Sequence, residues 1–127
     1  MAKIERFEEI KSWQKARELT NLIYDLTSEQ LFARDFELRN QIQRASGSIM
    51  HNIAEGFDAG SNKEFVRFLK MSRRSASEVQ SQLYLALDRK YLDQDQLQRA
   101  YSLCTEIKKL INALIKYLKE NDDPTKN

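Results

Sequence analysis

Basic side chains recur at helical spacing in one segment of the sequence. Steps of four, three and four residues separate Lys63, Arg67, Lys70 and Arg74. This spacing places four cations on one face of a helix, with Arg73 beside them. The segment from 63 to 74 holds these five cations and one acid, Glu64, a local charge of +4 within a chain whose formal charge is +2. Such a stripe predicts salt-sensitive, sequence-blind binding to nucleic-acid phosphates.

Four further lysines lie in a second amphipathic segment near the C-terminus: Lys108, Lys109, Lys116 and Lys119. We add them to the candidate nucleic-acid interface, in which Arg67, Lys70, Arg73 and Arg74 are the expected phosphate contacts. The alternative is a solvated face whose charges form ion pairs. Repetition of the stripe around a symmetric ring would favour binding, because the fields of the subunits add.

Arg44 and His51 are residue types that cleave RNA in other proteins, which is a different chemistry from phosphate binding alone. They are seven residues apart, hence on one helix face, and an Arg-x6-His pair on a helical bundle is similar to the small HEPN-type ribonucleases. There the arginine would hold phosphate and the histidine would act as acid or base. An isolated, exposed histidine explains the pair better, so a ribonuclease is the third hypothesis.

Other catalytic and metal-binding constellations are missing from the sequence. One His and one Cys cannot form a zinc cage or a disulfide. Cys104 lies on an apolar row, where a packed thiol is expected. There is no Gly-rich phosphate loop and no nucleophile elbow. We therefore expect no catalytic residues, no metal, no cofactor and no enzymatic activity.

The composition favours long helices. The chain has 127 residues, 31% of them charged and 41% hydrophobic, with three Gly and one Pro, which leaves few places to turn. The length fits one domain. The N-terminus carries charge without a following apolar stretch, and no apolar run approaches the ~20 residues of a membrane span. We expect a cytoplasmic protein that does not contact membranes.

Four segments show helical periodicity: from about 8 or 12 to 27, 36–56, 61–90 and 93–120. Asp35 is the expected N-cap of the second segment, and Ser61 and Glu64 form a capping box at the start of the third. Asp93 to Gln96 start the last segment in a similar way, and Gly56 offers a left-handed stop. Short connections between long helices favour antiparallel neighbours. The sequence predicts an all-α, antiparallel up-down-up-down four-helix bundle over residues 1–120, followed by a flexible tail at 121–127.

Small residues around Gly47 predict a close contact between the second and third segments. Folding back near residue 59 brings residues 45–48 close to Ser72, Ser75 and Ala76. Because glycine within a helix costs about 1 kcal/mol relative to alanine, Gly47 is expected to be needed for this close contact. We expect Gly47→Leu to destabilise the fold strongly.

The last segment has two adjoining apolar rows, one from Leu103 to Tyr117 and one from Leu97 to Leu118. Together they form a wider apolar face than contact with one neighbouring helix requires. They indicate either a partner surface or contact with two neighbouring helices. We expect polar side chains near the contact between helices to make structural contacts that set the register. These structural polar candidates are Arg44, Asn52, Glu55 and Glu78.

From Phe7 to about Leu118 the sequence resembles the small proteins encoded within intervening sequences of bacterial 23S rRNA genes. Its motifs are Phe7-x2-Ile10-x2-Trp13, Asn52-Ile53-Ala54-Glu55-Gly56 and Glu64-Phe65-x2-Phe68-Leu69. The resemblance implies a left-handed bundle, a ring-like homopentamer and no established enzymatic activity. The family is also similar to the accessory protein of diversity-generating retroelements, a basic pentamer that binds nucleic acid and assists a reverse transcriptase. This sequence departs from the pattern at Gln43, His51 and Arg74.

Together these observations predict a non-enzymatic, self-associating bundle, expected as a homopentamer, that binds RNA or DNA non-specifically through its basic face. A reverse transcriptase is a partner by analogy alone. The alternative function is a protein-interaction scaffold that does not bind nucleic acid.

Overall fold

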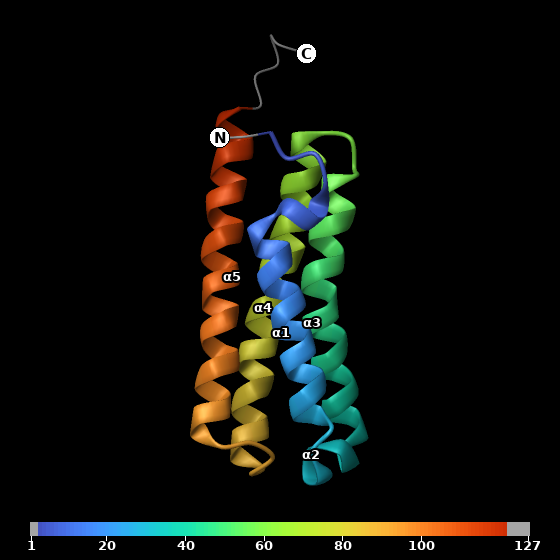
Figure 1. Ribbon diagram of the computed structural model, residues 1–127, viewed down its shortest axis with the longest axis vertical. Coiled ribbons are helices and arrows are strands. Elements are labelled where there is room, and N and C mark those ends of the chain that lie inside the picture. The colour runs from blue at the N-terminus through green and yellow to red at the C-terminus, as the bar shows by residue number, and fades with distance from the viewer. Residues whose placement is uncertain (1–2, 122–127) are drawn as a thin grey trace.

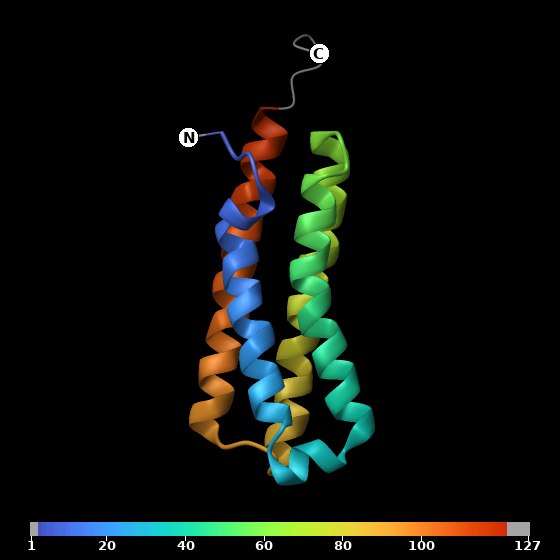
Figure 2. The same ribbon diagram turned by 45° about the vertical axis from the view of Figure 1, so that its right-hand side comes forward.

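Four long helices pack side by side in the structure, a computed structural model that describes residues 3–121 (Figures 1 and 2). They are α1 (Lys11–Thr27), α3 (Phe36–Phe57), α4 (Asn62–Asp88) and α5 (Gln94–Glu120). The chain runs down α1, up α3, down α4 and up α5 in Figure 1. Helices α1 and α4 each contact α3 and α5. The all-α class is thereby confirmed, whereas the left-handed arrangement stays a prediction.

Side chains at the expected positions begin three of the long helices. The Asp35 carboxylate accepts a hydrogen bond from the backbone N–H of Leu38 at 3.1 Å. The Ser61 hydroxyl accepts one from Glu64 at 3.1 Å, but the Glu64 carboxylate turns to Arg67 at 2.9 Å instead of completing the capping box. Asp93 and Gln96 form a complete box. Each cap satisfies backbone donors that the first helical turn leaves free.

Two helix ends differ from the prediction, and Gly56 is not the left-handed residue that follows α3. Gly56 lies within α3, which continues to Phe57. The left-handed residue is Gly60, with φ of +93°, and it turns the chain into α4. Helix α4 ends at Asp88, ahead of the predicted 90. Lys90, with φ of +63°, makes the turn there, so a non-glycine residue occupies a position that usually favours glycine.

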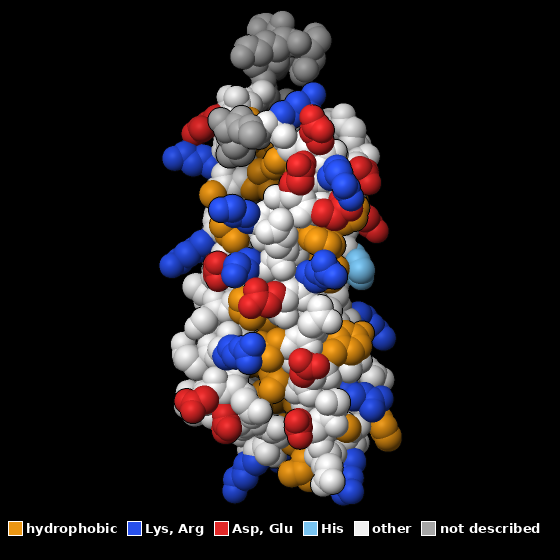
Figure 3. All heavy atoms as spheres, in the orientation of Figure 1, with side chains coloured by type: hydrophobic (Ala, Val, Ile, Leu, Met, Phe, Trp, Pro, Cys, Tyr) orange, Lys and Arg blue, Asp and Glu red, His pale blue; other side chains and the backbone are white. Residues whose placement is uncertain are grey.

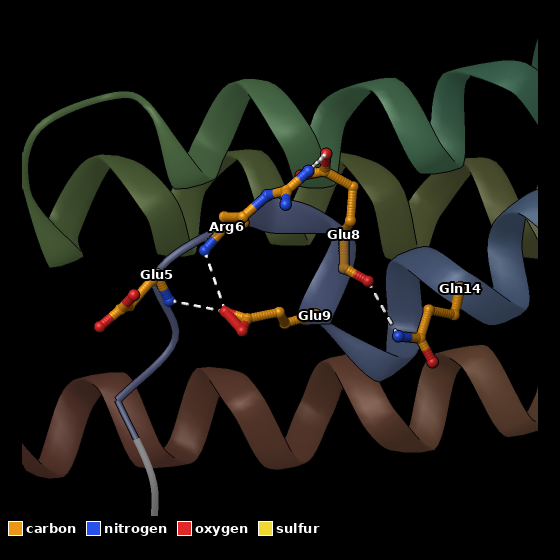
Figure 4. A network of polar contacts seen from close by, with 5 residues as sticks. All are labelled: Glu5, Arg6, Glu8, Glu9 and Gln14. Atoms are coloured by element: carbon orange, nitrogen blue, oxygen red, sulfur yellow. Dashed lines mark hydrogen bonds and ion pairs between the residues drawn. The ribbon is translucent and has the colours of Figure 1, made fainter.

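Two short elements are present in addition to the four predicted helices. A 3-10 helix, η1 (Phe7–Glu9), precedes α1, and Figure 4 shows the polar contacts that hold it. The Glu9 carboxylate accepts hydrogen bonds from the backbone N–H groups of Glu5 and Arg6 at 2.9 and 3.1 Å, and Gln14 donates to the Glu8 carbonyl at 2.8 Å. These bonds fold the N-terminal segment against the start of α1.

The second short element, α2 (Gln30–Arg34), closes the opposite end of the bundle (Figure 2). Its Phe32 is fully buried, and the Phe32 ring stacks on Tyr91 with centroids 5.2 Å apart. The Tyr91 hydroxyl donates to Asp35 at 2.9 Å. The Leu38 amide and the Tyr91 hydroxyl together hold the pKa of Asp35 below its ordinary value, because both bonds favour the ionised carboxylate.

The core fills the space between the four long helices. Every long helix contributes side chains that are fully buried, among them Leu19, Ile23, Ile42, Ile49, Ile53, Leu69, Leu83, Ile107 and Ile111. Cys104 is buried with them, and burial raises the pKa of its thiol to about 12. The reactive thiolate is therefore scarce at neutral pH, as expected for a packed cysteine.

The predicted contact between α3 and α4 is present, but Gly47 does not make it. The Ser72 hydroxyl donates to the Ile49 carbonyl at 2.8 Å, and Ser75 bonds Ser48 at 3.2 Å. A Cβ on Gly47 would meet the His51 ring at 3.8 Å, an ordinary contact. The structure gives no support to the expectation that Gly47→Leu disrupts this packing, because the atoms nearest an added Cβ belong to His51 of the same helix and not to α4.

Candidate nucleic-acid interface

Two adjoining hollows follow the seam between α4 and α5. The first, of about 410 Å³, is lined by Asn62, Lys63, Glu64, Val66, Arg67 and Lys70 from α4 and by Leu118 and Lys119 from α5. The second, of about 370 Å³, is lined by Lys70, Arg73, Arg74 and Ser77 from α4 and by Lys108 from α5. Because Lys70 lines both hollows, they form one continuous surface, which we call the basic groove.

Seven cationic side chains line the basic groove: Lys63, Arg67, Lys70, Arg73, Arg74, Lys108 and Lys119. Glu64 is the one carboxylate among its described lining residues. It pairs with Arg67 at 2.9 Å, and both side chains are about half exposed, so solvent weakens the pair. The groove therefore keeps a large excess of positive charge along one seam of the bundle.

Neutral side chains hold two of the groove cations in place. Arg73 Nη1 donates to Asn112 Oδ1 at 2.6 Å, and Lys108 Nζ donates to Gln80 Oε1 at 3.1 Å. Gln80 is 8% exposed, and its amide nitrogen donates to Thr105 at 3.0 Å. Because both partners are uncharged amides, they orient the cations without cancelling the charge available to an anion.

The face in Figure 3 is different: positive and negative side chains are mixed over it. Helix α1 is in front in this orientation, and α4 lies behind it (Figure 1). Ion pairs link Lys15 of α1 to Glu18 at 3.5 Å and to Glu106 of α5 at 3.8 Å. This part of the surface fits the solvated, ion-paired alternative, and it contrasts with the basic groove.

The structure separates the remaining candidates from the groove. Lys109 and Lys116 are exposed on α5 but line neither hollow. Arg44 and His51 are exposed on α3, and neither lines these hollows. Within residues 3–121, no side-chain hydrogen bond or ion pair joins Arg44 or His51 to another residue, so the ribonuclease hypothesis gains no support from the structure.

Of the four structural polar candidates, Asn52 and Glu78 make hydrogen bonds within their own helices. In the part of the chain that the structure describes, no side-chain hydrogen bond or ion pair involves Arg44 or Glu55, so the structure does not support the expected register-setting contacts at these two exposed residues. Asn52 donates to the carbonyl and hydroxyl of Ser48, both at 2.9 Å, within α3. Glu78 accepts from Gln82 at 3.3 Å within α4, and Glu55 is exposed. Through the Ser48–Ser75 bond, Asn52 belongs to a polar chain that reaches α4.

Sequence reasoning missed Ser77, Gln80 and Asn112 as parts of the site. Ser77 follows Lys63 and Lys70 at seven-residue intervals, a signal that the charge pattern concealed because Ser77 is uncharged. Asn112 and Gln80 act across the seam, so their role depends on how α4 and α5 align.

Over residues 3–121, no three His, Cys, Asp or Glu side chains gather in a way that could hold a metal ion, and no helix is long and apolar enough to cross a membrane.

The fold and the groove define an all-helical bundle with a basic seam. The profile of the 23S rRNA-intervening sequence protein family matches residues 8–113, so the chain belongs to this family. A crystal structure of a protein of unknown function from the S23 ribosomal protein family of Bacteroides thetaiotaomicron VPI-5482 is similar, with 32% identity and a TM-score of 0.71. That match covers 84% of this chain and 95% of the Bacteroides chain. No curated protein shows significant similarity.

Proposed function

We propose that this protein is a non-enzymatic, cytoplasmic nucleic-acid-binding protein that contacts RNA or DNA through the basic groove. The observation that carries the proposal is the gathering of seven cations along the α4/α5 seam, where Glu64 is the one carboxylate among the described lining residues. Phosphates neutralised there release condensed counterions, which drives binding without reading the base sequence.

The proposal includes self-association of left-handed, up-down-up-down bundles into a homopentamer, because a ring would join the grooves of its subunits into one basic band. Half-buried apolar side chains support it. Leu110 and Leu114 of α5 line a hollow of about 490 Å³ with Ala113, Ile4 and Ile10. Sedimentation equilibrium of the purified protein is expected to give five times the monomer mass, and a clean monomer would contradict this part of the proposal.

Reversing three groove cations tests the binding itself. We expect Arg67→Glu/Lys70→Glu/Arg74→Glu to abolish measurable binding to a structured RNA, because three phosphate contacts become repulsive. The wild-type protein should lose affinity steeply between 50 and 200 mM salt, with a slope of about −0.7 to −0.9 per phosphate contact. Fluorescence anisotropy of labelled RNA measures both effects.

The control has the same change in net charge outside the groove. It reverses Arg17, Arg34 and Arg99, which are exposed on α1, α2 and α5 and line neither hollow. We expect this variant to bind within a few-fold of wild type. Equal losses of affinity in both variants would mean that the net charge of the protein, and not the groove, determines binding. If wild-type protein did not bind nucleic acid even at low salt, the protein-interaction scaffold would be the better interpretation.

A further inference from the structure

The basic groove continues into an exposed aromatic pair. On α4, Lys63, Lys70, Ser77 and Tyr84 recur every seven residues, so they follow one stripe of the helix. Seven residues also separate Tyr101 from Lys108 on α5. The two tyrosines therefore lie about 10 Å beyond Ser77 and Lys108, at a rise of about 1.5 Å per residue.

Contacts across the seam confirm that the two tyrosines meet. The rings of Tyr84 and Tyr101 are 5.7 Å apart at their centroids, with an interplanar angle of 71°. Gln80, which holds Lys108, also donates to the Tyr101 carbonyl at 3.4 Å. Tyr84 is 50% exposed, while Tyr101 is half-buried beside it. Tyr101 thus packs against Tyr84 in a T-shaped arrangement, and half of the Tyr84 side chain remains open to solvent.

We propose, resting on the proposed function, that the groove binds unpaired nucleic acid, with phosphates along its cations and one base stacked on Tyr84. A positive groove that ends on an exposed aromatic side chain has the two parts that single-strand binding requires. A continuous duplex offers its phosphates but keeps its base faces inside its own stack. Tyr84 therefore favours unpaired strands, whether RNA or DNA, over duplexes.

The test compares a labelled 12-nucleotide RNA or DNA strand with the duplex of the same sequence. Removing the stacked ring in Tyr84→Leu should weaken single-strand binding by roughly five-fold to 100-fold. The same variant should leave duplex binding and the salt slope unchanged, because the groove cations remain. Tyr84→Phe keeps the aromatic face and should bind the single strand nearly as wild type does.

Tyr24 provides the matched control, because it is 52% exposed but lies on α1, away from the α4/α5 seam. Tyr24→Leu should change neither affinity. A strand in which abasic sites replace the bases should bind wild-type protein and Tyr84→Leu equally, since no base remains to stack.

Three results would overturn the stacking proposal while leaving phosphate binding intact: equal loss of single-strand and duplex affinity in Tyr84→Leu, no loss of either, or a loss that persists with the abasic strand. A changed sedimentation coefficient of Tyr84→Leu without nucleic acid would also overturn it, because the tyrosine pair would then be an interface between copies. Failure of the groove itself is distinguishable, since neither nucleic acid would then bind to wild-type protein.

Discussion

Gly56→Ala will lower the free energy of unfolding by about 2 kcal/mol, whereas Gly47→Ala will raise it by up to about 1 kcal/mol. Both glycines lie within α3, so the better helix propensity of alanine favours both substitutions, but less at Gly56, which is one residue from the helix end. The difference comes from their neighbours on other helices. Urea denaturation of the two variants, followed by circular dichroism at 222 nm, measures both values.

Gly56 is where α3 and α4 approach too closely for a side chain. A Cβ at this position would lie 2.7 Å from Phe68 Cβ and 2.9 Å from Phe65 Cδ1. Phe68 Cβ is attached directly to the backbone of α4, so rotating the side chain does not move it away. The two helices would have to separate, and the loss of packing would exceed the gain in propensity.

Gly47 is the control because its surroundings are open. The nearest atoms to an added Cβ belong to the His51 ring, 3.8 Å away. If Gly56→Ala were as stable as wild type, the helices would tolerate a wider spacing and the close approach would have no energetic importance. Destabilisation of Gly47→Ala would instead show that the close contact between α3 and α4 requires glycine at this position.

Phe32→Ala is expected to lower the free energy of unfolding by about 3–5 kcal/mol. The Phe32 side chain is fully buried at the end of the bundle, where it stacks on Tyr91. Its removal leaves a cavity and deprives Tyr91, which bonds the Asp35 N-cap, of its packing partner. The change should therefore loosen the start of α3 as well, which amide hydrogen exchange at Leu38 would detect.

Leu31 is the matched control for Phe32. It is the preceding residue in α2 and is 57% exposed, so Leu31→Ala should change stability by less than about 0.5 kcal/mol. Similar small effects of both substitutions would show that α2 is not an integral part of the folded core.

The long helices could be predicted from the sequence because the signals are local. Apolar residues at steps of three and four mark the buried face of each helix, and the caps at Asp35, Ser61 and Asp93 act within one turn. Phe32 had no such signal, because α2 is shorter than two turns and shows no periodicity. The prediction for Gly56 was wrong for a related reason. A glycine near the end of a helix has the pattern of a left-handed C-terminal residue, and its role in packing is visible only when the neighbouring helix is in place.

The candidate site likewise has one part that could be predicted from local sequence spacing and one part that depends on the packing of two helices. The cations from Lys63 to Arg74 share one face of α4, so their spacing alone brings them together. Lys108 and Lys119 face this stripe while Lys109 and Lys116 do not, a distinction that depends on how α5 is rotated against α4. The supports at Gln80 and Asn112, and the meeting of Tyr84 with Tyr101, depend on the same alignment.

By itself, then, the sequence determined the all-helical class, the approximate bounds of the long helices, the family resemblance and the charge of the α4 stripe, because each is encoded in residues within a few turns of one another. The tertiary structure alone decided which glycine permits close packing, how α2 closes the core, and which cations share a groove. These features arise where side chains distant in sequence meet, so they depend on helix rotation and register that no single segment encodes.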